Sequence, residues 1–241
     1  MCGRYGSIAS TAALAERFVA TATEDAEERV PSWNVAPTQP ARAVIERPDQ
    51  GRLIVALRWG LVPYWAKDPS IGSKQINARS ETVDKAPAYR NALVRHRCLI
   101  PADGFYEWRR IDDGTRRGQR QPYWFARADG DVMALAGLRE TWRDAEENLL
   151  RTCTIVTTES SVDVADIHDR MPVVLEPAVW DEWLDPGQRD AAAVKALLLP
   201  SPAGTLVRHP VSDEVNRPDA DGPELIEPIE EKTAPDGGRL F

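Results

Sequence analysis

The apolar stretches of this chain are short, and proline or glycine interrupts many of them. The sequence holds 19 prolines and 15 glycines in 241 residues, and most apolar runs have the length of a single strand. Helical spacing is confined to a few segments. Many short strands with a few helices predict a single α+β domain built mainly on antiparallel sheet.

The individual elements follow from this pattern. Strands are expected at residues 2–8, 43–46, 53–59, 97–101, 105–108, 123–127, 132–138 and 152–158. Helices are expected at residues 11–19, at 88–94, from Pro177 onward and at 189–199. Irregular structure is expected in four segments, which are a polar loop at 21–29, a turn at 33–38, an aromatic segment at 59–65 and an arginine-rich loop at 109–121.

The composition is that of a globular protein, with 42% hydrophobic and 28% charged residues. No apolar run has the length of a signal-peptide core or a membrane span, so we expect a cytosolic protein. The cysteines are Cys2, Cys98 and Cys153, and their odd number and wide spacing argue against a disulfide framework. Apolar neighbours place Cys98 and Cys153 in the core.

The charge is unevenly distributed. The net charge of −8 argues against a nucleic-acid partner, but residues 90–120 hold eight arginines and four carboxylates, a local balance of +4. Residues 210–241 hold nine carboxylates and three basic residues, a balance of −6. A basic face on such a protein is able to hold a phosphate backbone, although the same arginines would also serve as an ordinary solvated surface.

Cys2 follows the initiator methionine, which is normally removed when the next residue is this small. The mature chain would then begin with two adjacent nucleophiles, an α-amine with a pKa of about 7.7 to 8.0 and a thiol with a pKa of about 8.5. Such a 1,2-aminothiol condenses with an aldehyde to an imine and then closes to a thiazolidine, or the thiol accepts an acyl group. By itself, Cys2 is equally consistent with an unreactive terminal residue.

Glu107 lies among Phe105, Tyr106 and Trp108, so its carboxylate is expected to be partly desolvated, with a raised pKa suited to proton transfer. The alternative is a strand residue paired with an arginine. His168 precedes a buried strand, from which its side chain would face a cleft, and the alternative is a purely structural histidine. No two Cys or His residues have the close spacing of a metal loop, so no metal site is expected.

Asn77 and Arg79 offer amide and guanidinium donors that suit a phosphate or an oxyanion. Aromatic side chains at Trp33, Trp59, Tyr64 and Trp65 would stack on nucleic-acid bases, although most of the eight tryptophans must belong to the core.

Seven motifs stand in the order of a known protein family. They are Met1-Cys2-Gly3-Arg4-Tyr5, Trp33-Asn34-Val35-Ala36-Pro37-Thr38, Trp59-Gly60-Leu61-Val62-Pro63, Ile76-Asn77-Ala78-Arg79-Ser80-Glu81-Thr82, Gly104-Phe105-Tyr106-Glu107-Trp108, Ile167-His168-Asp169-Arg170-Met171-Pro172 and His209-Pro210-Val211-Ser212. In these motifs the chain resembles the SRAP (SOS-response-associated peptidase) family, proteins that crosslink to abasic sites in single-stranded DNA. The resemblance covers Cys2 to about Ile229 and implies an SRAP domain over residues 1–229, with an acidic tail at 230–241 whose last residues are expected to be disordered.

The resemblance implies an SRAP fold with an open barrel-like core, flanking helices and a basic DNA groove. It also implies that Cys2 attacks the ring-opened aldehyde of an abasic site and closes a thiazolidine. Asn77 would orient Cys2 or the opened sugar, and Glu107 would take a proton from the amine. His168 would exchange protons with the sugar oxygen during ring opening and with the adduct during its reversal.

The same resemblance gives Arg4, Asn34, Trp65 and Arg79 roles in DNA binding. Trp33 stands where the family often has tyrosine. The implied partner is single-stranded DNA containing abasic sites, at junctions with duplex. We expect a cytoplasmic monomer that associates with the nucleoid when bound to DNA and uses no cofactor.

Two alternatives remain open from the sequence. The first is a cysteine autopeptidase that uses Cys2 as acyl acceptor, to which lyase-type activity would be related. The second is a non-covalent single-strand-binding module in which Cys2 is incidental.

The Cys2→Ala variant separates covalent from non-covalent binding. It is expected to lose the DNA adduct that survives denaturation, because an imine without thiol closure hydrolyses, while reversible binding weakens less. Denaturing gels after incubation with a single strand carrying one abasic site measure this. Survival of the adduct in the variant would contradict the thiazolidine chemistry.

Overall fold

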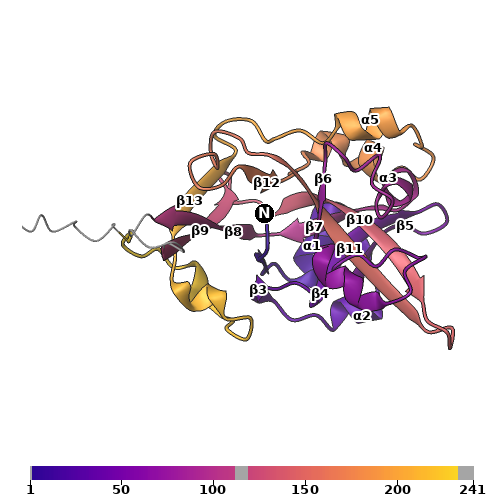
Figure 1. Ribbon diagram of the computed structural model, residues 1–241, viewed down its shortest axis with the longest axis horizontal. Coiled ribbons are helices and arrows are strands. Elements are labelled where there is room, and N and C mark those ends of the chain that lie inside the picture. The colour runs from indigo at the N-terminus through magenta and orange to yellow at the C-terminus, as the bar shows by residue number, and fades with distance from the viewer. Residues whose placement is uncertain (1, 112–118, 233–241) are drawn as a thin grey trace, which may run out of the picture.

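The computed structural model describes residues 2–111 and 119–232. Its strands form two sheets, and the N-terminal segment runs between them (Figure 1). A single hydrophobic cluster draws on both, with Phe105 and Phe125 from the smaller sheet and Trp59 and Ile100 from the larger one. The shared core fixes how the two sheets meet.

The smaller sheet has five strands in the order β13-β9-β8-β1-β3, all paired antiparallel. Its strands are β1 (Tyr5–Ser7), β3 (Ser32–Val35), β8 (Gly104–Ile111), β9 (Gln119–Arg127) and β13 (Leu206–Pro210). Strand β1 lies in the interior of this order, which places the start of the chain beside β8.

The larger sheet runs in the order β12-β11-β10-β7-β4-β5-β2, with β6 paired to β11. Its strands are β2 (Thr21–Ala22), β4 (Pro40–Arg47), β5 (Gly51–Trp59), β6 (Asn77–Arg79), β7 (Arg97–Ala102), β10 (Met133–Arg143), β11 (Leu149–Glu159) and β12 (Arg170–Pro172). A short parallel pairing of β11 with β5, Cys153 opposite Trp59, closes β10, β7, β4, β5 and β11 into a ring. This ring is the barrel-like core of the fold.

Side chains alternate between the two faces of the larger sheet, as the period of a strand requires. Ala43 and Ile45 of β4 join the core shared with the smaller sheet, whereas Val44 between them joins a second cluster under the helices. The second cluster includes Phe18 and Trp180, whose rings stack with centroids 4.7 Å apart. The helices therefore cover the outer face of this sheet.

The helices are short. They are α1 (Thr11–Phe18), α2 (Glu24–Glu27), α3 (Arg90–Arg95), α4 (Trp180–Leu184) and α5 (Ala191–Ala196), with 3-10 turns at Pro69–Lys74, Pro177–Val179, Asp213–Asn216 and Pro223–Ile226. Figure 1 shows α3, α4 and α5 gathered at one side of the barrel. Within the described ranges, no helix has the length and apolar character needed to cross a membrane.

The predicted fold class is confirmed, since one α+β domain with mainly antiparallel sheets is observed. The hairpin between 43–46 and 53–59 forms as β4 and β5, and Gly51 at the turn has a φ of +71°. Ser10 caps α1 by accepting the Ala13 N–H at 3.2 Å. Val19, expected within that helix, is instead its left-handed cap and is exposed.

Three segments expected to be irregular contain regular structure. Residues 21–29 form β2 and α2, because β2 pairs with the distant strand β5. The turn at 33–38 begins as β3, which pairs with β1. The loop at 109–121 is shorter than predicted, because β8 continues to Ile111 and β9 starts at Gln119, with residues 112–118 outside the described part.

The C-terminal segment packs on the smaller sheet as far as Lys232. The Lys232 N–H donates to Gln121 Oε1 at 3.2 Å, and Glu231 pairs with Arg109 and Tyr123. The boundary at 229 stays a prediction, and residues 233–241 of the expected tail lie outside the described residues.

The Gly104→Ala variant tests the packing of β8 on Trp124. A Cβ at position 104 would lie 2.1 Å from Trp124 Cζ2 and 2.5 Å from the Phe125 carbonyl oxygen, so we expect a loss of about 2 kcal/mol or more in unfolding free energy. Denaturant unfolding measures it. Gly130→Ala is the control, because it meets no atom within 4 Å and bears only the strain of its positive φ, about 1 kcal/mol. Equal losses in both would contradict the packing argument.

Candidate active site

Four predicted site residues come from separate parts of the chain and meet between the two sheets. Cys2 precedes β1, Asn77 begins β6, Glu107 lies on β8, and His168 lies just before β12. Asn77 Nδ2 donates to the Cys2 carbonyl at 2.8 Å, and His168 Nε2 lies 4.0 Å from Glu107 Oε2. The Glu107 carboxylate is close enough to Cys2 to raise the pKa of its thiol, so all four residues share one site.

Strand pairing determines this convergence. Tyr5 lies opposite Phe105, and the Tyr106 N–H donates to the Arg4 carbonyl at 3.0 Å, which brings the residues before β1 alongside Glu107. Strands β6 and β12 both pair with β11, with Asn77 opposite Ile155. Strand β11 therefore positions both Asn77, through β6, and His168, through β12.

Cys2 is fully buried, and its thiol makes one weak contact, 3.9 Å from Sγ to the Arg4 carbonyl oxygen. Burial raises the pKa of the thiol first, and the nearby Glu107 carboxylate raises it further. In this environment the thiol is neutral at physiological pH.

Glu107 is 2% exposed, and its burial raises the pKa of the carboxyl group, while His168 acts in the opposite direction. This agrees with the expectation from its aromatic sequence neighbours. A carboxyl group with a raised pKa is suited to both accepting and returning a proton near neutral pH.

His168 meets two groups through Nδ1. The Arg170 backbone N–H donates to Nδ1 at 2.9 Å, and Asp169 Oδ1 lies at the same distance. While Nδ1 accepts from Arg170, the neutral ring carries its proton on Nε2, the nitrogen that faces Glu107. The ring can therefore exchange its Nε2 proton with the site.

A groove of about 520 Å³ opens beside these groups. It is lined by Glu107, Trp108, Arg110, Arg120, Ile167, His168 and Asp169. The other arginines predicted to form a basic face are dispersed. Arg97 is buried and donates to main-chain carbonyls, Arg109 pairs with Glu231, and Arg116 and Arg117 lie outside the described residues.

The predicted DNA-binding residues differ in accessibility. Arg79 is exposed two residues from Asn77, Trp65 is 50% exposed, and Arg4 is partly buried with a 3.4 Å contact to the Asn216 carbonyl. Asn34 differs from this expectation because it is buried and its amide group donates to backbone carbonyls of residues 215, 217 and 220. The structure gives Asn34 the role of holding the C-terminal segment rather than a surface for DNA.

The aromatic residues predicted to stack on bases also differ in accessibility. Tyr64 is 61% exposed, as the stacking hypothesis requires, whereas Trp59 is fully buried and its indole N–H donates to the Ile76 carbonyl at 2.9 Å. Trp59 therefore belongs to the core.

Arg170 is a residue that the sequence reasoning missed. Its guanidinium donates to both carboxylate oxygens of Glu81, at 2.5 and 3.0 Å, and its backbone N–H donates to His168 Nδ1. The sequence offered one sign of a role at the site, which is the position of Arg170 two residues after His168. Its pairing with Glu81, 89 positions away, cannot be predicted from residue spacing.

Comparison with known proteins gives consistent matches. Residues 1–218 match the family described as "SOS response associated peptidase (SRAP)". The "Abasic site processing protein YoqW" of Bacillus subtilis is 43% identical over 94% of this chain and 99% of its own length. The mouse "Abasic site processing protein HMCES" is 32% identical over 86% of this chain and 67% of its own length.

Solved structures show the same fold. A Bacteroides thetaiotaomicron protein superposes with a TM-score of 0.83 at 20% identity, covering 95% of this chain and all of that one. A Bordetella bronchiseptica protein superposes with a TM-score of 0.73 at 28% identity, covering 88% of this chain and all of that one. The first of these supports the fold alone.

The Glu107→Gln variant tests the burial of this carboxyl group. A carboxyl group whose pKa is raised by folding destabilises the protein as the pH rises from its unfolded pKa of about 4.3 through the folded value. Glutamine lacks this effect, so the variant's melting temperature should gain on the wild type as the pH rises from about 4 to 8. Thermal melts measure it, with the exposed Glu182→Gln as control. A difference that does not change with pH would contradict the raised pKa.

Proposed function

Because this chain belongs to the SRAP family, we propose that it processes abasic sites in DNA by forming a covalent bond between Cys2 and the lesion. The relatives named above are abasic site processing proteins by name. The observation that carries the proposal is the gathering of a buried carboxyl group, a histidine and the Asn77 amide around Cys2.

The chemistry requires removal of Met1, which frees the α-amine of Cys2. The amine nitrogen bonds to the aldehyde carbon of the ring-opened deoxyribose, and loss of one water gives an imine. The thiol sulfur then bonds to the same carbon, and its proton passes to the nitrogen. The product is a five-membered thiazolidine, so no oxidant, reductant or cofactor is consumed.

Glu107 would act as the general base and then the general acid in the first steps. Its carboxylate takes a proton from the α-ammonium group and, once protonated, donates it to the departing hydroxyl group as water forms. Burial raises the pKa of this carboxyl group, which supports this double role because it makes the protonated form easier to reach than in an exposed glutamate. The burial of Cys2 itself raises the pKa of its thiol, so the thiol stays neutral until the imine forms.

Asn77 and His168 act on position and on the sugar. The Asn77 amide holds the Cys2 carbonyl at 2.8 Å and so fixes the main chain from which both nucleophiles project. The Nε2 proton of His168 is available to the ring oxygen of the sugar during ring opening, and it would return to the adduct during reversal.

The partner is proposed to be single-stranded DNA containing an abasic site, at a junction with duplex. Arg4 and Arg79 would contact phosphates, and the exposed Trp65 would stack at the junction. We propose a monomer that acts in the cytoplasm and on the nucleoid. Before the covalent step, affinity should be modest and salt-dependent.

Peptidase activity, which the family description names, remains the second candidate. A lyase-type step at the sugar would share the imine intermediate. The same site would serve an autopeptidase through the Cys2 thiol, but the buried, neutral thiol beside a carboxylate favours reaction through the amine.

Adduct kinetics test the proposal. With Met1-processed protein and a single strand carrying one abasic site, Glu107→Gln and His168→Gln should each slow adduct formation by about 10- to 100-fold, because each removes a proton-transfer group. Glu182→Gln, on the exposed side of α4, should leave the rate unchanged. Quenched time points on denaturing gels give the rates. Wild-type rates in both site variants would overturn the assigned roles.

A further inference from the structure

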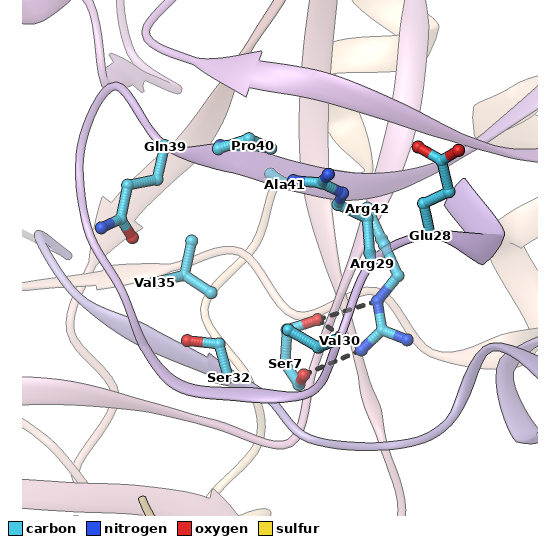
Figure 2. A pocket seen from close by; sticks show the side chains of 10 residues that line it. All are labelled: Ser7, Glu28, Arg29, Val30, Ser32, Val35, Gln39, Pro40, Ala41 and Arg42. Atoms are coloured by element: carbon cyan, nitrogen blue, oxygen red, sulfur yellow. Dashed lines mark hydrogen bonds between the residues drawn. The ribbon is translucent and has the colours of Figure 1, made fainter. Parts of the chain in front are cut away.

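A separate cavity of about 290 Å³ lies between β1, β3, β4 and the segment after α2 (Figure 2). Its lining is Ser7, Glu28, Arg29, Val30, Ser32, Val35, Gln39, Pro40, Ala41 and Arg42. It shares no lining residue with the groove beside Glu107. The cavity and the groove are therefore two separate hollows with different linings.

Arg42 is the charged group of this cavity. It is 3% exposed, and its guanidinium donates to Ser7 Oγ at 3.2 and 2.9 Å, to the Ser7 carbonyl at 2.8 Å and to Thr11 Oγ1 at 3.5 Å. All these acceptors are uncharged. Among the described residues Arg42 forms no salt bridge, and Asp103 acts on it only from a greater distance. A guanidinium does not lose its proton in a protein, so a buried charge without a close counter-ion remains.

Further donors face the same space. Within residues 2–111 and 119–232, the Nε of Arg29 is buried without a hydrogen-bond partner. Gln39 Nε2 makes a long contact of 3.5 Å to the Pro218 carbonyl, and Ser32 contributes a hydroxyl group. Figure 2 shows Glu28 at the rim, with its carboxylate turned away from the guanidinium that bonds Ser7. The interior of the cavity therefore presents mainly donors and positive charge.

We propose that this cavity binds one phosphate group, either as inorganic phosphate or as the phosphate of a small sugar phosphate. Two guanidinium groups, hydroxyl groups and an amide are the donors that proteins use for a phosphate dianion. The volume admits a phosphate with a few waters, at about 30 Å³ each, and lies at the lower limit for larger ligands. Bound phosphate supplies the counter-ion that Arg42 lacks.

Isothermal titration without DNA tests the proposal, at constant ionic strength, with inorganic phosphate and with ribose 5-phosphate as separate probes. One of the two should bind saturably with one-to-one stoichiometry, and the tighter probe identifies the source. Arg29→Met should weaken that binding at least about tenfold, which corresponds to 1.4 kcal/mol. Arg42→Met should abolish it, although Arg29→Met carries the test if loss of the buried arginine impairs folding.

Arg143→Met is the matched control, because it removes the same charge at an exposed position that pairs with Glu147. It should leave the affinity unchanged. Absence of saturable binding of either probe below about 10 mM, or equal weakening in Arg143→Met and Arg29→Met, would overturn the proposal. Because no DNA is present, failure here leaves the abasic-site proposal intact, and adduct formation by Arg29→Met should match the wild type.

Discussion

The hydrogen bond from Asn77 Nδ2 to the Cys2 carbonyl joins the two halves of this structure at the site. Cys2 reaches that point because β1 pairs with β8 and β3, whereas Asn77 reaches it because β6 pairs with β11 of the larger sheet. Each sheet thus supplies one partner of the contact. The geometry of the site depends on how the sheets pack across their shared core, and a shift between them would separate the reacting end of the chain from its supporting groups.

Burial at this contact destabilises the charged forms of Glu107 and Cys2, and the proposed reaction depends on the resulting shifts in pKa. Glu107 lies in the interior, where desolvation raises the pKa of its carboxyl group. Burial of Cys2 raises the pKa of its thiol, and the charge of Glu107 raises it further. Both groups are less stable charged than they would be at the surface. The proposed reaction needs such a carboxyl group. It must first take a proton from the α-ammonium group of Cys2 and then give one to the hydroxyl group that leaves the aldehyde carbon. The buried Glu107 therefore lowers the free energy of unfolding at neutral pH, and in return the site holds a carboxyl group suited to proton transfer.

The sequence predicted the parts of this protein that local pattern determines. The β4–β5 hairpin and the helix capped by Ser10 were predicted because turn residues and periodicity mark them. The segment at 21–29 was predicted wrongly because its strand exists only through pairing with β5, a contact that polar residues do not signal. Residue chemistry singled out Cys2, Asn77, Glu107 and His168 as candidates, the family resemblance supplied their expected roles, and the structure shows these four together. The hydrogen bonds of Asn34 and the ion pair of Arg170 could not be predicted from local pattern, because their partners lie far away along the chain.

The central claim is that Cys2 becomes covalently attached to an abasic site, and mass spectrometry tests it directly. Met1-processed protein is incubated with a single strand carrying one abasic site, the intact mass is recorded under denaturing conditions, and the attachment point is mapped after digestion. The account predicts a one-to-one adduct at Cys2 whose mass equals protein plus DNA minus one water, because imine formation releases one water and the closure of the thiazolidine releases nothing more. An adduct at another residue, or DNA retained only by non-covalent binding, would contradict it.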